Sequence, residues 1–218
     1  MANQEIGVPG IPGRNTAAGA VWRSRGYLPH FDNSLAIQHV TFHLADSLPK
    51  AVLERFEAEL RHFPDERREI ERRKRIDAWM DAGHGSQALR EPAIAGMVQS
   101  VLLFFDSQRY RILAWAVMPN HVHALFEPIH HWTVAKIVAS WKKFSAKEIR
   151  EWRRANGDQS NAPIWHREYW DRYIRDERHL VQTIQYIHSN PVKAGLVAKA
   201  EAWRWSSAFP GNANLPIG

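Results

Sequence analysis

The sequence predicts an α+β fold in which an antiparallel sheet carries helices on one face and a last helix is appended. Three features indicate this: short segments of alternating polarity, longer segments with apolar residues every three or four positions, and the order in which they follow each other. With 218 residues, 44% of them hydrophobic, and ten Trp, the chain can bury a core as one domain.

The first half of the chain predicts one strand and mainly helices. Residues 36–44 (AIQHVTFHL) alternate in polarity as a strand does. A helical pattern begins at Pro49 and continues to Met80, and its middle, 66–75, contains a single apolar residue. We interpret this polar stretch as a solvated helix face rather than a DNA contact. A loop over 82–92 and an apolar helix stripe from Ile94 to Phe105 follow.

The second half predicts the rest of the sheet. Strands are expected over 111–117 and 121–126, a helix over 133–154, an edge strand within 165–177, and a last helix from 176 that ends before Pro191. This order of elements is that of a ferredoxin-like (RRM-like) domain with an added C-terminal helix: strand, helices, two strands, helix, strand and helix.

The chain divides into three parts by composition. Residues 1–34 are predicted to be a flexible basic arm that begins with a stretch rich in Gly, Pro and Ala. Residues 35–209 are the expected main domain, with a helical insertion over 49–92. Residues 210–218 are the expected tail.

Composition limits the classes of function. A net charge of +6 and a pI of about 9.8 favour a polyanionic partner, nucleic acid first. The absence of cysteine excludes disulfides, Cys-ligated zinc and a thiol nucleophile. Neither a secretory signal nor a membrane-spanning apolar run is present in the sequence, so we expect no membrane association and a bacterial, cytoplasmic location.

His121 and His123 flank Val122 on the strand predicted over 121–126. Because successive strand residues alternate faces, both imidazoles point the same way. Two neutral imidazoles can hold a divalent metal ion. An isolated pair of this kind is more often simple polar surface, so the pair alone decides nothing.

The last predicted helix has a polar face formed by His179, Gln182, Tyr186 and Asn190. Tyr186 therefore does not belong to the apolar stripe, which weakens its interpretation as a core residue. Asn190, one turn further, could supply an amide oxygen to a metal. From this helix alone, a surface tyrosine is an equally good interpretation.

Together the two groups favour phosphodiester transfer through tyrosine. A metal ion polarises a phosphate and stabilises developing charge, while a tyrosyl oxygen can form the covalent intermediate. A phosphotyrosine retains the energy of the bond, which agrees with the absence of a Walker-type glycine loop from the sequence.

Four motifs in order, MPNHVHALFEP, SWKKFSAKEI, WHREYWDRYIRDE and YIHSNPVKAGLV, resemble the REP-associated tyrosine transposases. These form a branch of the IS200-like, HUH single-tyrosine transposase family. The resemblance covers roughly residues 22–208 and implies a catalytic domain that nicks single-stranded DNA near hairpin-forming palindromes. It implies that His121 and His123 bind the metal, that Tyr186 is the nucleophile on a C-terminal catalytic helix, and that Asn190 is the third ligand.

The expected partner is single-stranded or hairpin DNA of REP-like palindromes, bound near the nucleoid by a monomer or a homodimer. Interleaved cations and aromatic rings suit single strands. The predicted DNA-binding residues are Arg23, Arg25, Lys143, Lys147, Arg150, Trp165, Arg167, Trp170, Arg172 and Arg175. His39 and His43 share a face of the first strand and could approach the site, but we interpret them as locally hydrogen-bonded, and we interpret His188 as packed.

The sequence therefore predicts a Mg²⁺- or Mn²⁺-dependent enzyme that nicks and rejoins DNA through a 5′-phosphotyrosine. Two alternatives remain open: a domesticated hairpin-binding protein without turnover, and a His-ligated metal hydrolase that uses water.

Overall fold

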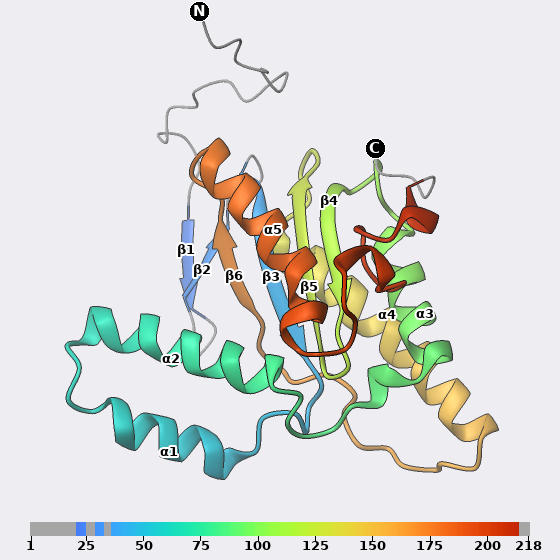
Figure 1. Cartoon of the computed structure of the whole chain (residues 1–218), viewed down its shortest axis with the longest axis horizontal. Helices are drawn as coiled ribbons and strands as arrows, with labels where there is room; N and C mark the ends of the chain where they lie inside the picture. The colour runs from blue at the N-terminus through green and yellow to red at the C-terminus, as the bar shows by residue number, and fades with distance from the viewer. Residues whose placement is uncertain (1–20, 25–28, 33–35, 214–218) are drawn as a thin grey trace, which may run out of the picture.

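A four-stranded antiparallel sheet forms the centre of the computed structural model, which describes residues 21–24, 29–32 and 36–213 (Figure 1). The strands lie in the order β4-β5-β3-β6. Helix α3 (Pro92–Leu103) connects β3 to β4, and α4 (Val134–Ala155) connects β5 to β6. This is the ferredoxin-like arrangement, so the predicted fold class is confirmed. The strands are β3 (Gln38–His43), β4 (Tyr110–Val117), β5 (His121–Pro128) and β6 (Trp170–Tyr173).

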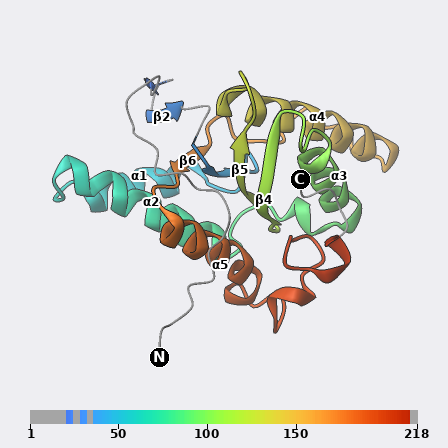
Figure 2. The same cartoon turned by 90° about the horizontal axis from the view of Figure 1, so that it is seen from above.

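The two faces of the sheet differ in what covers them. Helices α3 and α4 lie on one face, while α5 (Glu177–Lys193) and the C-terminal end of α2 (Asp65–Asp81) lie on the other (Figures 1 and 2). Val40, Phe42 and Val122 are fully buried in the core with α3 and α4. The residues between them, including Thr41 and His123, therefore face α2 and α5.

The register of β3 and β5 sets the neighbours of the histidine pair. Thr41 lies opposite His123, and His43 lies opposite His121. Antiparallel partners share a face of the sheet, so four polar side chains meet on the face that α2 and α5 cover.

The predicted helical insertion forms two helices rather than one. α1 (Lys50–Leu60) ends before Pro64, and α2 begins after it. Proline lacks the backbone N–H that a continuing helix requires, and it disfavours helical backbone in the residue before it. The polar stretch over 66–75 is not wholly solvated, because Arg72 pairs with Glu57 of α1 at 2.6 Å.

Helix α5 extends past Pro191, where the sequence predicted its end. Its N-terminus is capped by the Asp176 carboxylate, which accepts from the His179 N–H at 2.7 Å. Pro191 removes a single hydrogen bond in the last turn, and the helix ends at Lys193, whose neighbour Ala194 donates to the Asn190 carbonyl at 2.9 Å.

A β-hairpin lies within the predicted N-terminal arm. β1 (Val21–Ser24) pairs antiparallel with β2 (Pro29–Asp32), which lies beside β6. Short 3₁₀ turns are found at η1 (Ala88–Arg90), η2 (Ala200–Ala202) and η3 (Pro210–Asn212). Among the described residues, none of the helices has the length and apolarity that crossing a membrane requires.

Candidate active site

The candidate site is a cleft of about 480 Å³ between α2, α5 and the sheet. Its size lies within the roughly 300–1,000 Å³ of typical ligand sites. Each wall contributes polar side chains. They include His39 and Thr41 of β3, Arg73, Lys74, Asp77 and Asp81 of α2, Trp170 and Arg172 of β6, and His179, Gln182 and Tyr186 of α5.

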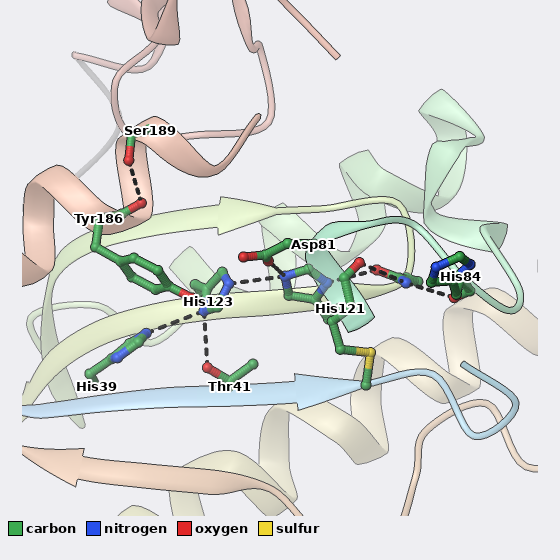
Figure 3. Close-up of polar contacts among 10 residues, drawn as sticks. His39, Thr41, Asp81, His84, His121, His123, Tyr186 and Ser189 are labelled. Atoms are coloured by element: carbon green, nitrogen blue, oxygen red, sulfur yellow. Dashed lines mark hydrogen bonds and ion pairs between the residues drawn. The ribbon is translucent and has the colours of Figure 1, made fainter. Parts of the chain in front are cut away.

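His121 and His123 lie side by side, as the alternation of the strand predicted (Figure 3). Their Nε2 atoms are 2.9 Å apart, and both side chains are almost fully buried. The ring centroids are 4.6 Å apart with nearly perpendicular planes. Both histidines thus direct the same nitrogen toward one point.

Asn120 fixes the proton of His121. Its Nδ2 donates to the carbonyls of Met80 at 3.2 Å and His84 at 2.9 Å, so its Oδ1 must face His121. Oδ1 lies 2.7 Å from His121 Nδ1, which therefore carries the proton. In the neutral ring, the lone pair of His121 is therefore on Nε2, the nitrogen that faces His123.

His123 is held from the other side by β3. Its Nδ1 lies 2.9 Å from the Thr41 hydroxyl and 3.2 Å from Nε2 of His39. Burial holds the pKa of His123 well below its ordinary range and lowers the pKa of His39 to about 3. Both rings are therefore neutral at physiological pH. Of the two alternatives for His39, the approach to the site is therefore the one observed, rather than local hydrogen bonding.

Asp81 is a site residue that the sequence interpretation missed. Its Oδ1 lies 3.5 Å from His121 Nε2 and is buried without a hydrogen-bond partner. One ligand atom from each of Asp81, His121 and His123 lies within 4.8 Å of the others. A carboxylate oxygen and an imidazole lone pair that face each other without a proton between them repel, and a cation between them would remove that repulsion.

Tyr186 of α5 lies beside the histidine pair (Figure 3). Its ring centroid is 5.4 Å from that of His123 and 5.9 Å from that of His39. Burial raises the pKa of Tyr186 well above its ordinary value, and Asp77 and Asp81 raise it further. The phenol is therefore neutral, and its use as a nucleophile requires a base or a positive charge nearby.

Asn190 is fully buried on α5, one turn beyond Tyr186. Neither of its amide atoms has a hydrogen-bond partner of ordinary geometry, although the amide is close enough to lower the pKa of Tyr186 slightly. A buried amide without partners costs free energy, which binding a ligand would offset. Its role as third ligand remains a prediction.

The predicted DNA-binding residues are divided between the two faces. Trp170 and Arg172 line the cleft. Lys143, Lys147 and Arg150 belong to α4, which lies across the sheet from α5, the helix that carries Tyr186 (Figure 2). Arg167 is exposed in the loop before β6, and Arg175 lies two residues before the start of α5. Arg23 lies on β1, and Arg25 lies outside the described residues.

Trp165 is a core residue, which corrects its interpretation as a base-stacking group. Its side chain is 7% exposed, packs edge to face on Phe42 with centroids 4.8 Å apart, and donates to the Ser145 hydroxyl at 2.9 Å. With its ring in contact with the core, it has no face for a base. His188 bonds to Ser207 at 2.8 Å, in agreement with its interpretation as a packed residue.

The fold and site define a ferredoxin-like domain with a paired-histidine, carboxylate-containing centre beside a helical tyrosine. Residues 90–190 match the family described as "Transposase IS200 like". The chain is 27% identical over 103 residues to a provisionally named REP-associated tyrosine transposase of Haemophilus influenzae, covering 45% of this chain and 58% of that protein. It is 26% identical over 102 residues to the REP-associated tyrosine transposase of Escherichia coli K12, covering 45% and 54%.

A solved structure of a REP-associated tyrosine transposase bound to a REP hairpin superposes with a TM-score of 0.54 at 18% identity, covering 86% of this chain and 85% of that one. The fold is therefore shared. The matched segment spans little more than half the length of the two curated relatives. The chain is therefore similar to IS200-like transposases over residues 90–190, and to REP-associated tyrosine transposases, which its motifs also resemble.

Proposed function

We propose that this chain is a metal-dependent, single-stranded DNA endonuclease and strand transferase that acts beside hairpin-forming palindromic repeats. Tyr186 is the proposed nucleophile, and a 5′-phosphotyrosine is the proposed intermediate. Residues 35–209 are the proposed catalytic domain. The observation that supports this most is the packing of Tyr186 against His123, with ring centroids 5.4 Å apart, in a cleft lined by polar side chains.

The side chains fit a divalent metal ion. His121, His123 and Asp81 would hold it, and the partnerless amide of Asn190 would complete the set. A mixed set of imidazole, carboxylate and amide ligands suits Mg²⁺ or Mn²⁺, which are the proposed cofactors. When bound, the ion would withdraw charge from the phosphate and position it.

The proposed reaction balances without an external energy source. The Tyr186 oxygen forms a bond to phosphorus, its proton passes to solvent water, and the bond from phosphorus to the 3′ oxygen breaks. The released strand end takes up a proton as a 3′-hydroxyl. Rejoining reverses these steps with the same or another 3′-hydroxyl, which restores the tyrosine.

Single-stranded or hairpin DNA is the proposed partner. The related transposase in the superposed structure is bound to a REP hairpin, and we extend that substrate class to this chain as part of the proposal. The net charge of +6 agrees with a polyanionic substrate.

Covalent attachment to a labelled hairpin oligonucleotide with single-stranded flanks tests the proposal. With Mn²⁺ present, the wild type should form a denaturation-resistant adduct. Tyr186→Phe should form none while it retains the affinity of the wild type, since only one oxygen is lost. Tyr173→Phe, which removes a hydroxyl outside the cleft lining, is the matched control and should behave as the wild type.

Two results would favour the alternatives. Cleavage that persists in Tyr186→Phe would indicate a hydrolase that uses water. Hairpin binding by the wild type without any adduct or cleavage in Mg²⁺ or Mn²⁺ would indicate a binding protein without turnover.

A further inference from the structure

Arginines from two separate elements line the cleft in which Tyr186 lies. Arg73 comes from α2 and Arg172 from β6. The sequence interpretation included Arg172 among the DNA-binding residues but assigned the polar middle of α2 to solvent. The fold of the α1–α2 insertion instead brings Arg73 to the same space as Arg172.

The two guanidinium groups repel each other. Burial lowers the pKa of Arg172, and the charge of Arg73 lowers it further. Both charges also depress the pKa of His39. The Nε of Arg73 is buried without a hydrogen-bond partner. Like charges brought together in a partly buried place cost free energy, which an anion between them would reverse.

Charge alternates along the α2 wall of the cleft. Arg73, Asp77 and Asp81 are spaced four residues apart and therefore lie on one stripe of the helix. Asp81 is at the histidine pair, and Arg73 is two turns away, roughly 12 Å along the helix axis. The stripe thus presents a carboxylate where a metal ion would bind and a guanidinium some distance along the cleft. Asp77, between them, offsets part of the positive charge.

We propose that Arg73 and Arg172 form a binding site for one DNA phosphate that lies within a few nucleotides of the scissile phosphate. The planar guanidinium donates two parallel hydrogen bonds to phosphate oxygens, which suits two arginines on opposite sides of one strand. The inference rests on the proposed function for its ligand, single-stranded DNA. It assigns to the α1–α2 insertion the task of holding the strand that leads to Tyr186.

Binding in the Tyr186→Phe background tests the site without cleavage. Two fluorescent hairpins are titrated by anisotropy at several NaCl concentrations, one with single-stranded flanks and one with none. Arg73→Ala should weaken binding of the flanked hairpin by about tenfold or more, as expected for a charge-assisted hydrogen bond. It should reduce the salt slope by about 0.7, which corresponds to one phosphate on a single strand. Binding of the hairpin without flanks should not change.

Arg67→Ala is the matched control, because Arg67 is exposed on the same helix and does not line the cleft. Arg73→Lys should restore the salt slope but only part of the affinity, since lysine keeps the charge and loses the planar fork. If Arg73→Ala perturbs folding by circular dichroism, Arg73→Gln replaces it in the same comparison.

A double-mutant cycle decides whether the two arginines share a phosphate. The double variant, Arg73→Ala with Arg172→Ala, should lose less affinity for the flanked hairpin than the product of the fold-losses of the two single variants. The inference would be overturned if Arg73→Ala bound the flanked hairpin with the same affinity and salt slope as Arg67→Ala. It would also be overturned if the effects of Arg73→Ala and Arg172→Ala on the binding free energy were fully additive. Failure of the wild type to form a covalent adduct would overturn the proposed function alone, because the binding assay does not depend on cleavage.

Discussion

Asp81 lies at the histidine pair and Asn190 lies one turn beyond Tyr186 on another helix, and each has a buried polar atom without a hydrogen-bond partner. The Oδ1 of Asp81 is 3.5 Å from His121 Nε2, while both amide atoms of Asn190 are buried. A carboxylate adds a full negative charge to the ligand set, whereas an amide adds a dipole. Replacing Asp81 and replacing Asn190 should therefore change the metal affinity to different extents.

Asp81→Asn should weaken Mn²⁺ binding by roughly tenfold or more, since even the partners of metal ligands commonly contribute 10–100-fold. Isothermal titration calorimetry with MnCl₂ measures this without DNA or turnover. Asp46→Asn is the control, because Asp46 is exposed and outside the site. If Asp81→Asn binds Mn²⁺ with the affinity of the wild type while Asn190→Ala binds it more weakly, Asp81 is not a ligand. The ligands would then be the two histidines and the Asn190 amide.

The sequence predicted those site residues that share an element. Strand alternation placed His121 and His123 on one face, and helical spacing placed Tyr186 with His179 and Gln182 on a stripe that does line the cleft. Asp81 is forty positions before His121, and no periodicity connects them. Its contact depends on how α2 packs against the sheet, which local pattern does not encode.

At the scale of elements, the end of α2 is held against the β3–α1 connection. Gly85 has φ +79°, and a Cβ there would meet the Ser47 Cα at 2.6 Å and two backbone oxygens under 3.0 Å. The residue before it, His84, provides a carbonyl that Asn120 uses to orient His121. Close backbone approach at this glycine thus links the insertion to the histidine pair.

Gly85→Ala should lower the free energy of unfolding more than Gly157→Ala. Gly157 has a similar φ of +88° and nothing within 4 Å of an added Cβ. Strain alone costs about 1–2 kcal/mol at either position, and the backbone clash should add about 1–3 kcal/mol at Gly85. Urea unfolding followed by circular dichroism measures both. Equal losses would show that the Ser47 segment moves aside freely.

Element positions were predicted well where polarity repeats and less well at prolines. The strands at 110–117 and 121–128 and the helix at 134–155 lie within two residues of the predicted bounds. Pro64 divided a helix that the apolar pattern had joined, and Pro191 lies inside a helix that it was expected to end. Proline excludes one backbone hydrogen bond, and whether the helix continues depends on how many remain to be formed.

At the scale of the whole molecule, positive charge is divided between the cleft and the far face of the sheet. Arg73 and Arg172 line the cleft, whereas Lys143 and Lys147 lie on α4, on the face opposite Tyr186. Lys147 is 66% exposed and only 3.8 Å from Glu151, so its contribution to a DNA-binding field is partly offset. We infer that the cleft binds the single strand and that α4 contributes a general attraction to phosphates.

This division predicts how salt and DNA form affect binding. Flanked hairpins should bind more tightly than a matched duplex of equal length, and the logarithm of affinity should fall linearly with the logarithm of salt, by about 0.7 per phosphate contacted on a single strand. Lys143→Ala combined with Lys147→Ala should weaken duplex and hairpin alike, with a flatter salt slope for both. Arg172→Ala should weaken binding of the flanked hairpin selectively, because Arg172 lines the same cleft as Tyr186. Equal affinity of the wild type for duplex and flanked hairpin at every salt concentration would contradict a strand-binding cleft, since charge alone does not distinguish the two forms.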